Sequence, residues 1–314
     1  MSGCIRRCVV TGPTGAVGTA LIAALLAEET EVFAVYRPGS RREDDIPDGA
    51  IRIACDLKDL AMLPDRISGT VDAFFHLGWA GTIGPERDDM MLQNDNVRHA
   101  LEAVNAAARL GCSVFVGTGS QAEYGPREGI LSADTPAFPV NGYGIAKLCA
   151  GQMTRIACRQ FGIRHVWARI LSVYGPHDNP RSVLPMLMNA IMDKREFPLT
   201  KGEQEWDYLY SKDAARALIA LANHGKDGRI YPLGSGKTHT LKWYFTQLRD
   251  AADPDYVLKI GQVPYPANQV MHLMADITDV QKDTGWYPEY CFEDGIRETV
   301  ESARVHREKE GLMQ

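Results

Sequence analysis

The first half of the chain alternates short apolar runs with longer segments in which apolar residues recur every three or four positions. Runs of β-branched and aromatic residues predict strands, whereas the wider spacing in alanine- and leucine-rich segments predicts helices. The predicted strands are Cys8–Thr11, Val32–Tyr36, Arg52–Cys55, Ala73–Leu77, Val114–Thr118 and Val166–Ile170. The predicted helices are Ala16–Ala27, Gln93–Leu110 and Tyr143–Phe161. This alternation is typical of βαβ units, so we expect an α/β fold with a doubly wound parallel sheet.

The pattern changes after Gly175, where four prolines separate shorter elements and a second irregular stretch runs from residue 225 to about 275. Between these stretches, Lys212–Ala222 predicts a helix that returns to the first domain. We therefore expect a Rossmann domain formed by residues 1–170 and about 207–224. A smaller, mixed α/β substrate-binding lobe is expected from about 171–206 and 225–314. Ile83–Asp89 and Pro126–Asn141 are expected to be loops.

Composition narrows the class of protein. A length of 314 residues with 45% hydrophobic content permits a large core, and a net charge of −6 gives no general attraction to nucleic acid or to an anionic membrane. No apolar stretch is long enough to span a bilayer, and no room is left for a secretory signal before the first strand. Seven cysteines without a C-x-x-C pair indicate free thiols in a reducing compartment, and the histidines show no metal-ligand spacing. We expect a cytoplasmic protein without a metal.

A glycine-rich turn follows the first predicted strand and opens the first predicted helix. In this position glycine permits the tight turn and the close approach of a pyrophosphate, which the helix N-terminus stabilises. The G-x-x-G-x-x-G spacing differs from the common G-x-G-x-x-G, and a purely structural turn is the alternative. The residues expected to hold a dinucleotide here are Gly12, Thr14, Gly15, Ala16, Val17 and Gly18.

The end of the second predicted strand indicates which dinucleotide is bound. An acidic residue there would bond the ribose 2′-hydroxyl, but this chain has Tyr36 followed by Arg37, with Ser40 and Arg41 close behind. A guanidinium recognises phosphate through charge-assisted hydrogen bonds, so the sequence favours NADP, with NAD as the second choice. The alternative is a solvated basic loop balanced by Glu43, Asp44 and Asp45.

Asp56 and Leu57 follow the third predicted strand. This position would let them contact the adenine of the cofactor. An aspartate that ends a strand is also an ordinary helix cap, so both interpretations stay open for Asp56.

Tyr143 and Lys147 lie four residues apart on a predicted helix, so both side chains project from one face. An ammonium beside a phenol favours the phenolate, which makes the tyrosine a usable acid or base. The pair Tyr208 and Lys212 has the same spacing, but only Tyr143 follows a strand whose carboxyl end would carry ligands. Ser120 stands just past that strand, free to hydrogen-bond a substrate oxygen.

These motifs, taken together, resemble the extended short-chain dehydrogenases of the NAD-dependent epimerase/dehydratase family, which act on nucleotide sugars. The resemblance rests on T-G-x-x-G-x-x-G, His76-Leu77-Gly78, Asn96, Ser120 ahead of Tyr124-Gly125, Tyr143-x-x-x-Lys147, Val173-Tyr174-Gly175-Pro176, Trp206-Asp207-Tyr208 and Gly285-Trp286-x-Pro288. It implies that Tyr143 exchanges a proton with the sugar, that Lys147 grips the nicotinamide ribose, and that Ser120 orients the reacting oxygen. It further implies that Asn96 supports the site and that Leu77 borders the cofactor.

Three departures from the family pattern shape the expected activity. The 4,6-dehydratases carry acids where this chain has Gln121 and Ala122, and Glu123 is one place off, so elimination is disfavoured. Tyr36 replaces the acidic residue of many 4-epimerases. The arginines that clamp the substrate pyrophosphate are missing, and Trp206 stands at one of their positions. Arg181, Lys201 or another cation is expected to take over, unless the substrate is not a nucleoside diphosphate sugar.

We therefore expect an NADPH-dependent reductase of a keto sugar, in particular a nucleotide-activated 4-keto-6-deoxyhexose bound by Ser120, Gln121, Tyr143, Arg181 and Trp206. The alternatives are an NAD(P)-dependent nucleotide-sugar 4-epimerase, a reductase of a small non-sugar carbonyl compound and a non-catalytic dinucleotide-sensing protein. The sequence also predicts a homodimer, because the two long alanine-rich helices carry more apolar residues than one buried face needs.

Overall fold

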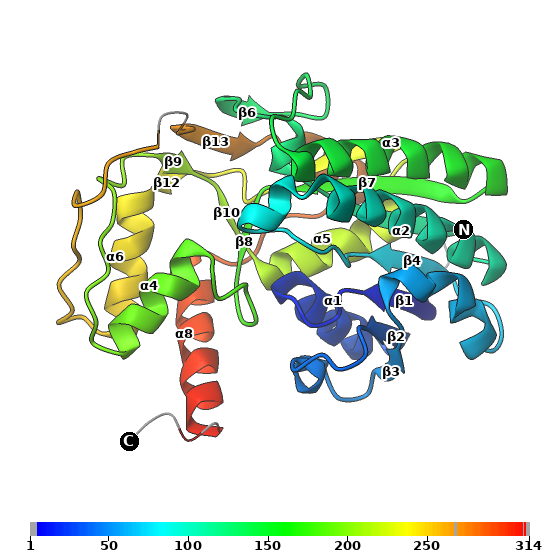
Figure 1. Ribbon diagram of the computed structural model, residues 1–314, viewed down its shortest axis with the longest axis horizontal. Coiled ribbons are helices and arrows are strands. Elements are labelled where there is room, and N and C mark those ends of the chain that lie inside the picture. Colours follow the sequence, from blue (N-terminus) through cyan, green and yellow to red (C-terminus); the bar gives the residue numbers. More distant parts are fainter. Residues whose placement is uncertain (1–4, 267–268, 310, 312–314) are drawn as a thin grey trace.

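The computed structural model describes residues 5–266, 269–309 and 311. Its centre is a seven-stranded parallel sheet with the strand order β11-β7-β5-β4-β1-β2-β3 (Figure 1). The strands are β1 (Arg7–Thr11), β2 (Glu31–Tyr36), β3 (Ile51–Ala54), β4 (Ala73–His76), β5 (Val114–Ser120), β7 (Arg164–Ile170) and β11 (Arg229–Leu233). The order reverses direction beside β1, which confirms the doubly wound α/β fold predicted from the sequence.

Helices cover both faces of this sheet (Figure 1). On one face α1 (Ala16–Ala27) packs beside α5 (Ser211–His224), and on the other α2 (Met90–Arg109) packs beside α3 (Gly142–Phe161). Neighbouring strand residues alternate between the two layers: Val10 belongs to the core under α1 and α5, and Val9 to the opposite core. Helix α2 begins three residues before the predicted start because Asp89 accepts hydrogen bonds from the N–H groups of Met91 and Leu92.

A smaller lobe stands beside the carboxyl edge of the sheet. It contains a four-stranded sheet in the order β12-β9-β13-β6 and a two-stranded pair of β8 with β10. Its strands are β6 (Gly129–Leu131), β8 (Ser172–Tyr174), β9 (Glu205–Trp206), β10 (Tyr208–Tyr210), β12 (His239–Thr240) and β13 (His272–Ala275). Helices α4 (Val183–Met192), α6 (Leu241–Ala252) and α8 (Phe292–Lys309) enclose an aromatic core, and α7 (Thr278–Thr284) packs on α5.

Three strands lie on the other side of the predicted boundary between the domain and the lobe. Strand β10, expected in the Rossmann domain, pairs with β8 of the lobe. Strand β11, expected in the lobe, pairs with β7 and forms an edge of the main sheet, where Pro232 is tolerated. Strand β6, in a segment expected to be a loop of the Rossmann domain, pairs with β13 of the lobe. These pairings join segments far apart in the chain. The division into domain and lobe otherwise stays a prediction.

Four short 3-10 helices complete the fold: η1 (Glu43–Asp45), η2 (Leu57–Arg66), η3 (Pro85–Asp88) and η4 (Gln121–Glu123). Helix η3 lies in the predicted loop Ile83–Asp89, and η4 directly follows β5. Within the described ranges, no helix is long and apolar enough to cross a membrane.

Candidate active site

The glycine turn after β1 is packed against the end of β4. The Thr11 hydroxyl accepts hydrogen bonds from the N–H groups of Leu77 and Gly78 at 3.1 and 3.0 Å. Gly12 has a φ of +71°, and a Cβ there would lie 2.9 Å from the Gly78 nitrogen. A Cβ on Gly18 would lie 2.1 Å from the Gly12 carbonyl oxygen. The turn therefore requires glycine at both positions, as the sequence analysis argued.

A pocket of about 350 Å³ opens above this turn. The predicted cofactor residues Gly12, Thr14, Tyr36, Arg37, Asp56 and Leu57 line it, together with Trp79, Ala80, Asn96 and His99. Gly15, Ala16, Val17, Gly18, Leu77 and Lys147 do not line this pocket. Gly15 is the N-cap of α1 and makes no side-chain cap, so the first N–H groups of the helix are left for a ligand. This cradle fits the pyrophosphate of a dinucleotide.

Two of the three acidic residues in the loop after β2 pair with other cations. Asp45 pairs with Arg42 at 2.8 Å, and Asp44 lies 3.8 Å from Arg52. A hydrogen bond to Glu43 raises the pKa of Tyr36. Arg37 is exposed at the pocket and forms no ion pair with a carboxylate in the described part of the chain. Its guanidinium is therefore available to a ligand, which favours the phosphate-binding interpretation over a balanced basic loop.

The same loop is fastened to the lobe. Arg42 donates a hydrogen bond to the His177 carbonyl oxygen at 2.8 Å, and His177 Nδ1 lies 3.3 Å from Asp45. The Ser40 hydroxyl in turn accepts the N–H of Arg42. Arg42 thus contacts both Ser40 in this loop and His177 in the lobe. Asp56 caps η2 by accepting the N–H of Lys58 at 3.1 Å, and it also lines the pocket, where its contact with the adenine stays a prediction.

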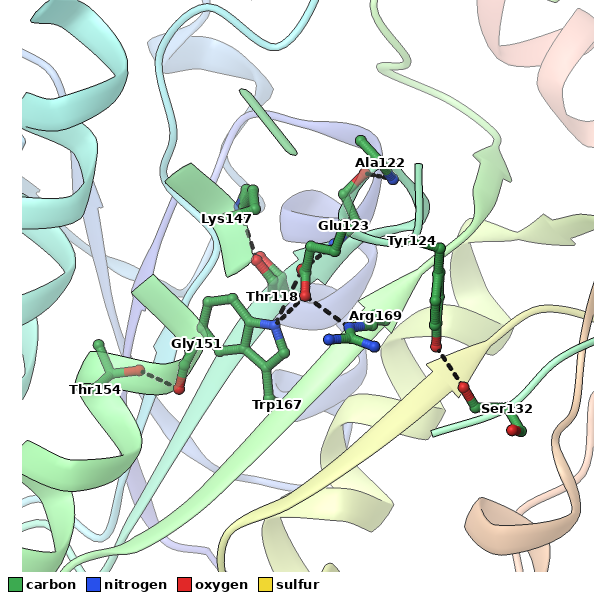
Figure 2. A network of polar contacts seen from close by, with 11 residues as sticks. Thr118, Ala122, Glu123, Tyr124, Ser132, Lys147, Gly151, Thr154, Trp167 and Arg169 are labelled. Atoms are coloured by element: carbon green, nitrogen blue, oxygen red, sulfur yellow. Dashed lines mark hydrogen bonds and ion pairs between the residues drawn. The ribbon is translucent and has the colours of Figure 1, made fainter. Parts of the chain in front are cut away.

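Ser120, Tyr143 and Lys147 meet at the carboxyl end of β5. Ser120 is the last residue of β5, and Asn141 caps α3 so that Tyr143 and Lys147 lie on its first turns. A hydrogen bond from Ser120 lowers the pKa of Tyr143, although burial raises it more. Lys147 donates to the Thr118 carbonyl oxygen at 2.7 Å (Figure 2), and burial lowers its pKa to about 7. A lysine with this pKa can exchange a proton near neutral pH.

Trp79 belongs to this site, although no motif in the sequence marks it as a functional residue. The Lys147 ammonium lies 3.9 Å from the centre of its ring, and its edge faces Tyr143 with the ring centres 6.3 Å apart. Its indole donates to Gln93 at 2.9 Å. Asn96 bonds both backbone groups of Ala80, at 3.0 and 2.9 Å, and so holds the segment that carries Trp79. Helix α2 therefore supports the site through two amide side chains.

Glu123 is the second residue that sequence reasoning left without a role. Its carboxylate is fully buried and accepts a hydrogen bond from the Ser120 N–H at 2.8 Å. It also accepts hydrogen bonds from the Trp167 indole at 3.1 Å and the Arg169 guanidinium at 2.6 Å (Figure 2). It therefore fixes the backbone of Ser120 and is not free to act as an acid. One signal was present in the sequence, because Arg169 places a charge inside an otherwise apolar strand.

The predicted substrate residues lie in different surroundings. Gln121 follows Ser120, and its side-chain oxygen is buried with no hydrogen-bond partner within the described chain. Arg181 is exposed, donates to the Ile83 carbonyl oxygen at 3.2 Å and lies 3.9 Å from Glu86, so it is anchored on the loop after β4. The Trp206 indole donates to Ser172 at 2.8 Å while its ring packs in the lobe core. Gln121 is thus the one of the three with a buried polar atom that has no partner in the described residues.

The second Tyr-x-x-x-Lys pair and the glycine loop at residues 234–238 have structural roles. Tyr208 lies on β10 in the aromatic core, and Lys212 pairs with Glu298. The N–H groups of Ser235 and Gly236 donate to the buried carboxylate of Asp207, so they are not free for phosphate. No group of three or more potential metal ligands is found in the described residues.

Comparison with known proteins shows which family the chain resembles. The family model described as the NAD dependent epimerase/dehydratase family matches residues 8–234. A dTDP-glucose 4,6-dehydratase of Escherichia coli is 29% identical over 179 residues, which cover 54% of this chain and 50% of the relative. The chain thus spans about half the length of that relative. A dTDP-glucose 4,6-dehydratase of Streptomyces griseus is 27% identical over 304 residues, which cover 94% of this chain and 88% of the relative.

Solved structures share the fold. The UDP-glucose 4-epimerase of Thermotoga maritima superposes with a TM-score of 0.86 at 21% identity, covering 96% of this chain and 99% of the other. The dTDP-glucose 4,6-dehydratase DesIV of Streptomyces venezuelae, solved with NAD bound, gives a TM-score of 0.85 at 21% identity and covers 96% and 98% of the two chains. The chain belongs to the NAD-dependent epimerase/dehydratase family and is an enzyme of the extended short-chain dehydrogenase/reductase type.

Proposed function

We propose that this enzyme reduces a keto sugar with NADPH, the substrate being a nucleotide-activated 4-keto-6-deoxyhexose, and that Tyr143 donates the proton. The observation that carries the cofactor choice is the free guanidinium of Arg37, which lines the cofactor pocket where Tyr36 replaces an acidic residue. Ser120, Tyr143 and Lys147 lie together in a buried site, which supports proton transfer to a bound carbonyl compound. A nucleotide sugar is favoured because the named relatives act on dTDP- and UDP-sugars.

Each residue of the site has its own role in the proposed reduction. When bound, the dinucleotide supplies the hydride that forms the new C–H bond. Tyr143 transfers its phenolic proton to the carbonyl oxygen, which becomes a hydroxyl group. Ser120 holds that oxygen by a hydrogen bond, and its own backbone is held by Glu123. Lys147 and the ring of Trp79 lie beside Tyr143, where Lys147 would grip the nicotinamide ribose and stabilise the phenolate left behind.

Elimination of the kind named for the dehydratase relatives is a poor fit to this site. Dehydration of a sugar requires an acid that protonates the leaving hydroxyl group. Gln121 and Ala122 supply none, and the carboxylate of Glu123 is consumed by Trp167 and Arg169. The similarity in sequence to dehydratases therefore supports the family and the sugar-nucleotide class more strongly than the reaction.

A nucleotide-sugar 4-epimerase using NAD is the second candidate. The observation in its favour is that solved neighbours include UDP-sugar 4-epimerases, one of them in complex with NAD. Such an enzyme would retain its cofactor and show no net oxidation. A cytoplasmic location is proposed for either candidate, because Cys8, Cys55, Cys112, Cys149, Cys158 and Cys291 are free thiols.

Calorimetric titration of the cofactor-free protein with NADPH and with NADH tests the proposal. We expect tighter binding of NADPH and NADPH oxidation when a nucleotide-activated 4-keto-6-deoxyhexose is added. Tyr143→Phe should reduce turnover by at least 100-fold, because it removes the proton donor, and should leave NADPH binding within about twofold. Preference for NADH, or bound NAD that does not dissociate, would favour the epimerase. Unchanged turnover in Tyr143→Phe would remove Tyr143 from its role, and binding without any turnover would favour a sensing protein.

A further inference from the structure

Arg87 lies directly over the catalytic tyrosine. Its guanidinium carbon is 4.5 Å from the centre of the Tyr143 ring, closer than the 6.0 Å that separates the Lys147 ammonium from the same ring. Arg87 belongs to η3, in the loop between β4 and α2, and it carries no motif that marks it in the sequence. Its contact with Tyr143 arises only when this loop docks on α3.

The docking of η3 is specific. The Arg87 side chain donates to the Thr82 carbonyl oxygen at 3.0 Å, and Asp88 accepts the N–H of Gly142 at 2.8 Å. A Cβ on Gly142 would lie 2.9 Å from the Arg87 carbonyl oxygen, so the absence of a side chain there lets η3 approach the first turn of α3. Gln93 donates to the Glu86 carbonyl oxygen and steadies the loop from α2. Arg87 is therefore held against the ring from several sides.

The charge of Arg87 is available to the ring. Within the described chain, Arg87 forms no ion pair with a carboxylate, and the neighbouring Glu86 faces Arg181 instead. A guanidinium over an aromatic face is attracted to the ring, and it stabilises the ring more strongly once the hydroxyl group has lost its proton. Arginine side chains in general stay charged in proteins, whereas lysine side chains can lose their charge when buried.

The charges around Tyr143 show why a second cation matters. Burial raises the pKa of Tyr143, Glu123 raises it further, and Ser120 and Arg87 lower it. Lys147 is buried, and its pKa is lowered to about 7, so it loses its charge as the pH rises above neutrality. Arg87 alone among these groups supplies a permanent positive charge next to the phenol.

We propose that Arg87 is a positioning residue that stabilises the Tyr143 phenolate and thereby sets the pH above which Tyr143 no longer donates its proton. This inference rests on the proposed role of Tyr143 as the proton donor. Arg87 acts through the tyrosine ring and is distinct from the missing cation that would hold a substrate pyrophosphate.

The test compares Arg87→Met with Arg159→Met, a control that removes an exposed arginine from the far end of α3. In the reduction direction, activity falls as Tyr143 loses its proton at high pH. Arg87→Met should move this alkaline limb of kcat/KM upward by about one pH unit, because the phenolate is less stable without the guanidinium. Arg159→Met should leave the limb in place. A rate that falls equally at all pH values in Arg87→Met would show a merely structural role and overturn the proposal.

A spectroscopic titration gives a readout that needs no substrate. The tyrosinate absorbance of Tyr143 is measured as a difference between two spectra, at pH values below alkaline unfolding. The spectrum of each protein that also carries Tyr143→Phe is subtracted from the spectrum of the same protein with Tyr143. We expect less tyrosinate in Arg87→Met at a given pH, and an intermediate amount in Arg87→Lys, which keeps a charge but not the planar group. Equal tyrosinate in wild type and both variants would overturn the inference even if Tyr143→Phe abolishes turnover. Retained turnover in Tyr143→Phe would instead refute the proposed function.

Discussion

Glu123 and Arg169 form an ion pair in a part of the molecule that water does not reach, with side-chain exposures of 0% and 3%. The attraction between the two charges offsets the cost of removing them from water only while both are present. Glu123 also accepts hydrogen bonds from the backbone N–H of Ser120 and from the indole N–H of Trp167. One carboxylate therefore links the stability of the sheet with the geometry of the catalytic serine.

We predict that Glu123→Gln destabilises the protein by about 3–5 kcal/mol, because Arg169 keeps its charge in a buried site without a counter-charge. Urea unfolding followed by circular dichroism measures this loss. Glu196→Gln is the matched control, because Glu196 is 77% exposed in its pair with Lys259, and such surface pairs contribute about 0–1 kcal/mol. Similar losses in the two variants would contradict the structural role given to the buried pair.

At the scale of secondary-structure elements, the central strands carry two buried histidines. His76 ends β4 with its Nδ1 3.0 Å from the Thr11 hydroxyl, and His165 lies on β7 with its Nε2 3.0 Å from the Thr154 hydroxyl. The rings of both stack on Phe115 of β5. Burial lowers the pKa of His76 to about 3 and that of His165 to about 4. Both are therefore neutral in the folded sheet.

These histidines predict a loss of stability in mild acid. Above pH 6.5 they are neutral in both the folded and the unfolded chain and contribute no pH dependence. Below pH 6.5 only the unfolded chain takes up the protons, so each histidine lowers the free energy of unfolding by about 1 kcal/mol between pH 7 and 5.5. Urea unfolding at the two pH values measures the loss. His165→Gln should make the fall in the free energy of unfolding between pH 7 and 5.5 smaller, because it removes the contribution of His165. The control His224→Gln changes an exposed histidine and should leave that contribution in place. The same fall in His165→Gln as in the wild type would contradict the prediction.

The elements that sequence predicts are those whose signal is local. The period of apolar residues and the glycine turn locate α1 with the bounds that the structure shows, and they locate the first five strands to within two residues. Strands β6 and β9 have three and two residues, too few to show an alternating apolar pattern in the sequence. They are strands because their backbones pair with β13. The site divides in the same way. Tyr143 and Lys147 follow from their spacing, whereas Trp79 and Arg87 reach Tyr143 only through the docking of loops.

At the scale of the whole molecule, the surface of α3 is unusually apolar for a helix that faces solvent. Ile145, Met153 and Ile156 are 52%, 43% and 52% exposed, and with Cys149 they form a stripe on one side of the helix. Helix α2, by contrast, uses its apolar residues against α3 and η2, apart from Met90 and Met91, which are exposed at its first turn. The excess of apolar residues that the sequence analysis assigned to both helices is therefore concentrated on α3, and it would be covered if two copies met there.

We predict a homodimer that uses this stripe, since two-fold association places the same helix of each copy in contact. Light scattering should give a mass twice the 34.7 kDa of one chain. Ile145→Glu combined with Ile156→Glu should yield monomers, because paired carboxylates in an apolar interface lose their hydration without gaining a partner. Met62→Glu, which adds a charge at a residue 54% exposed on η2, should leave the dimer intact. A monomeric wild-type protein, or a dimer that survives both α3 substitutions, would show that the stripe is not the interface.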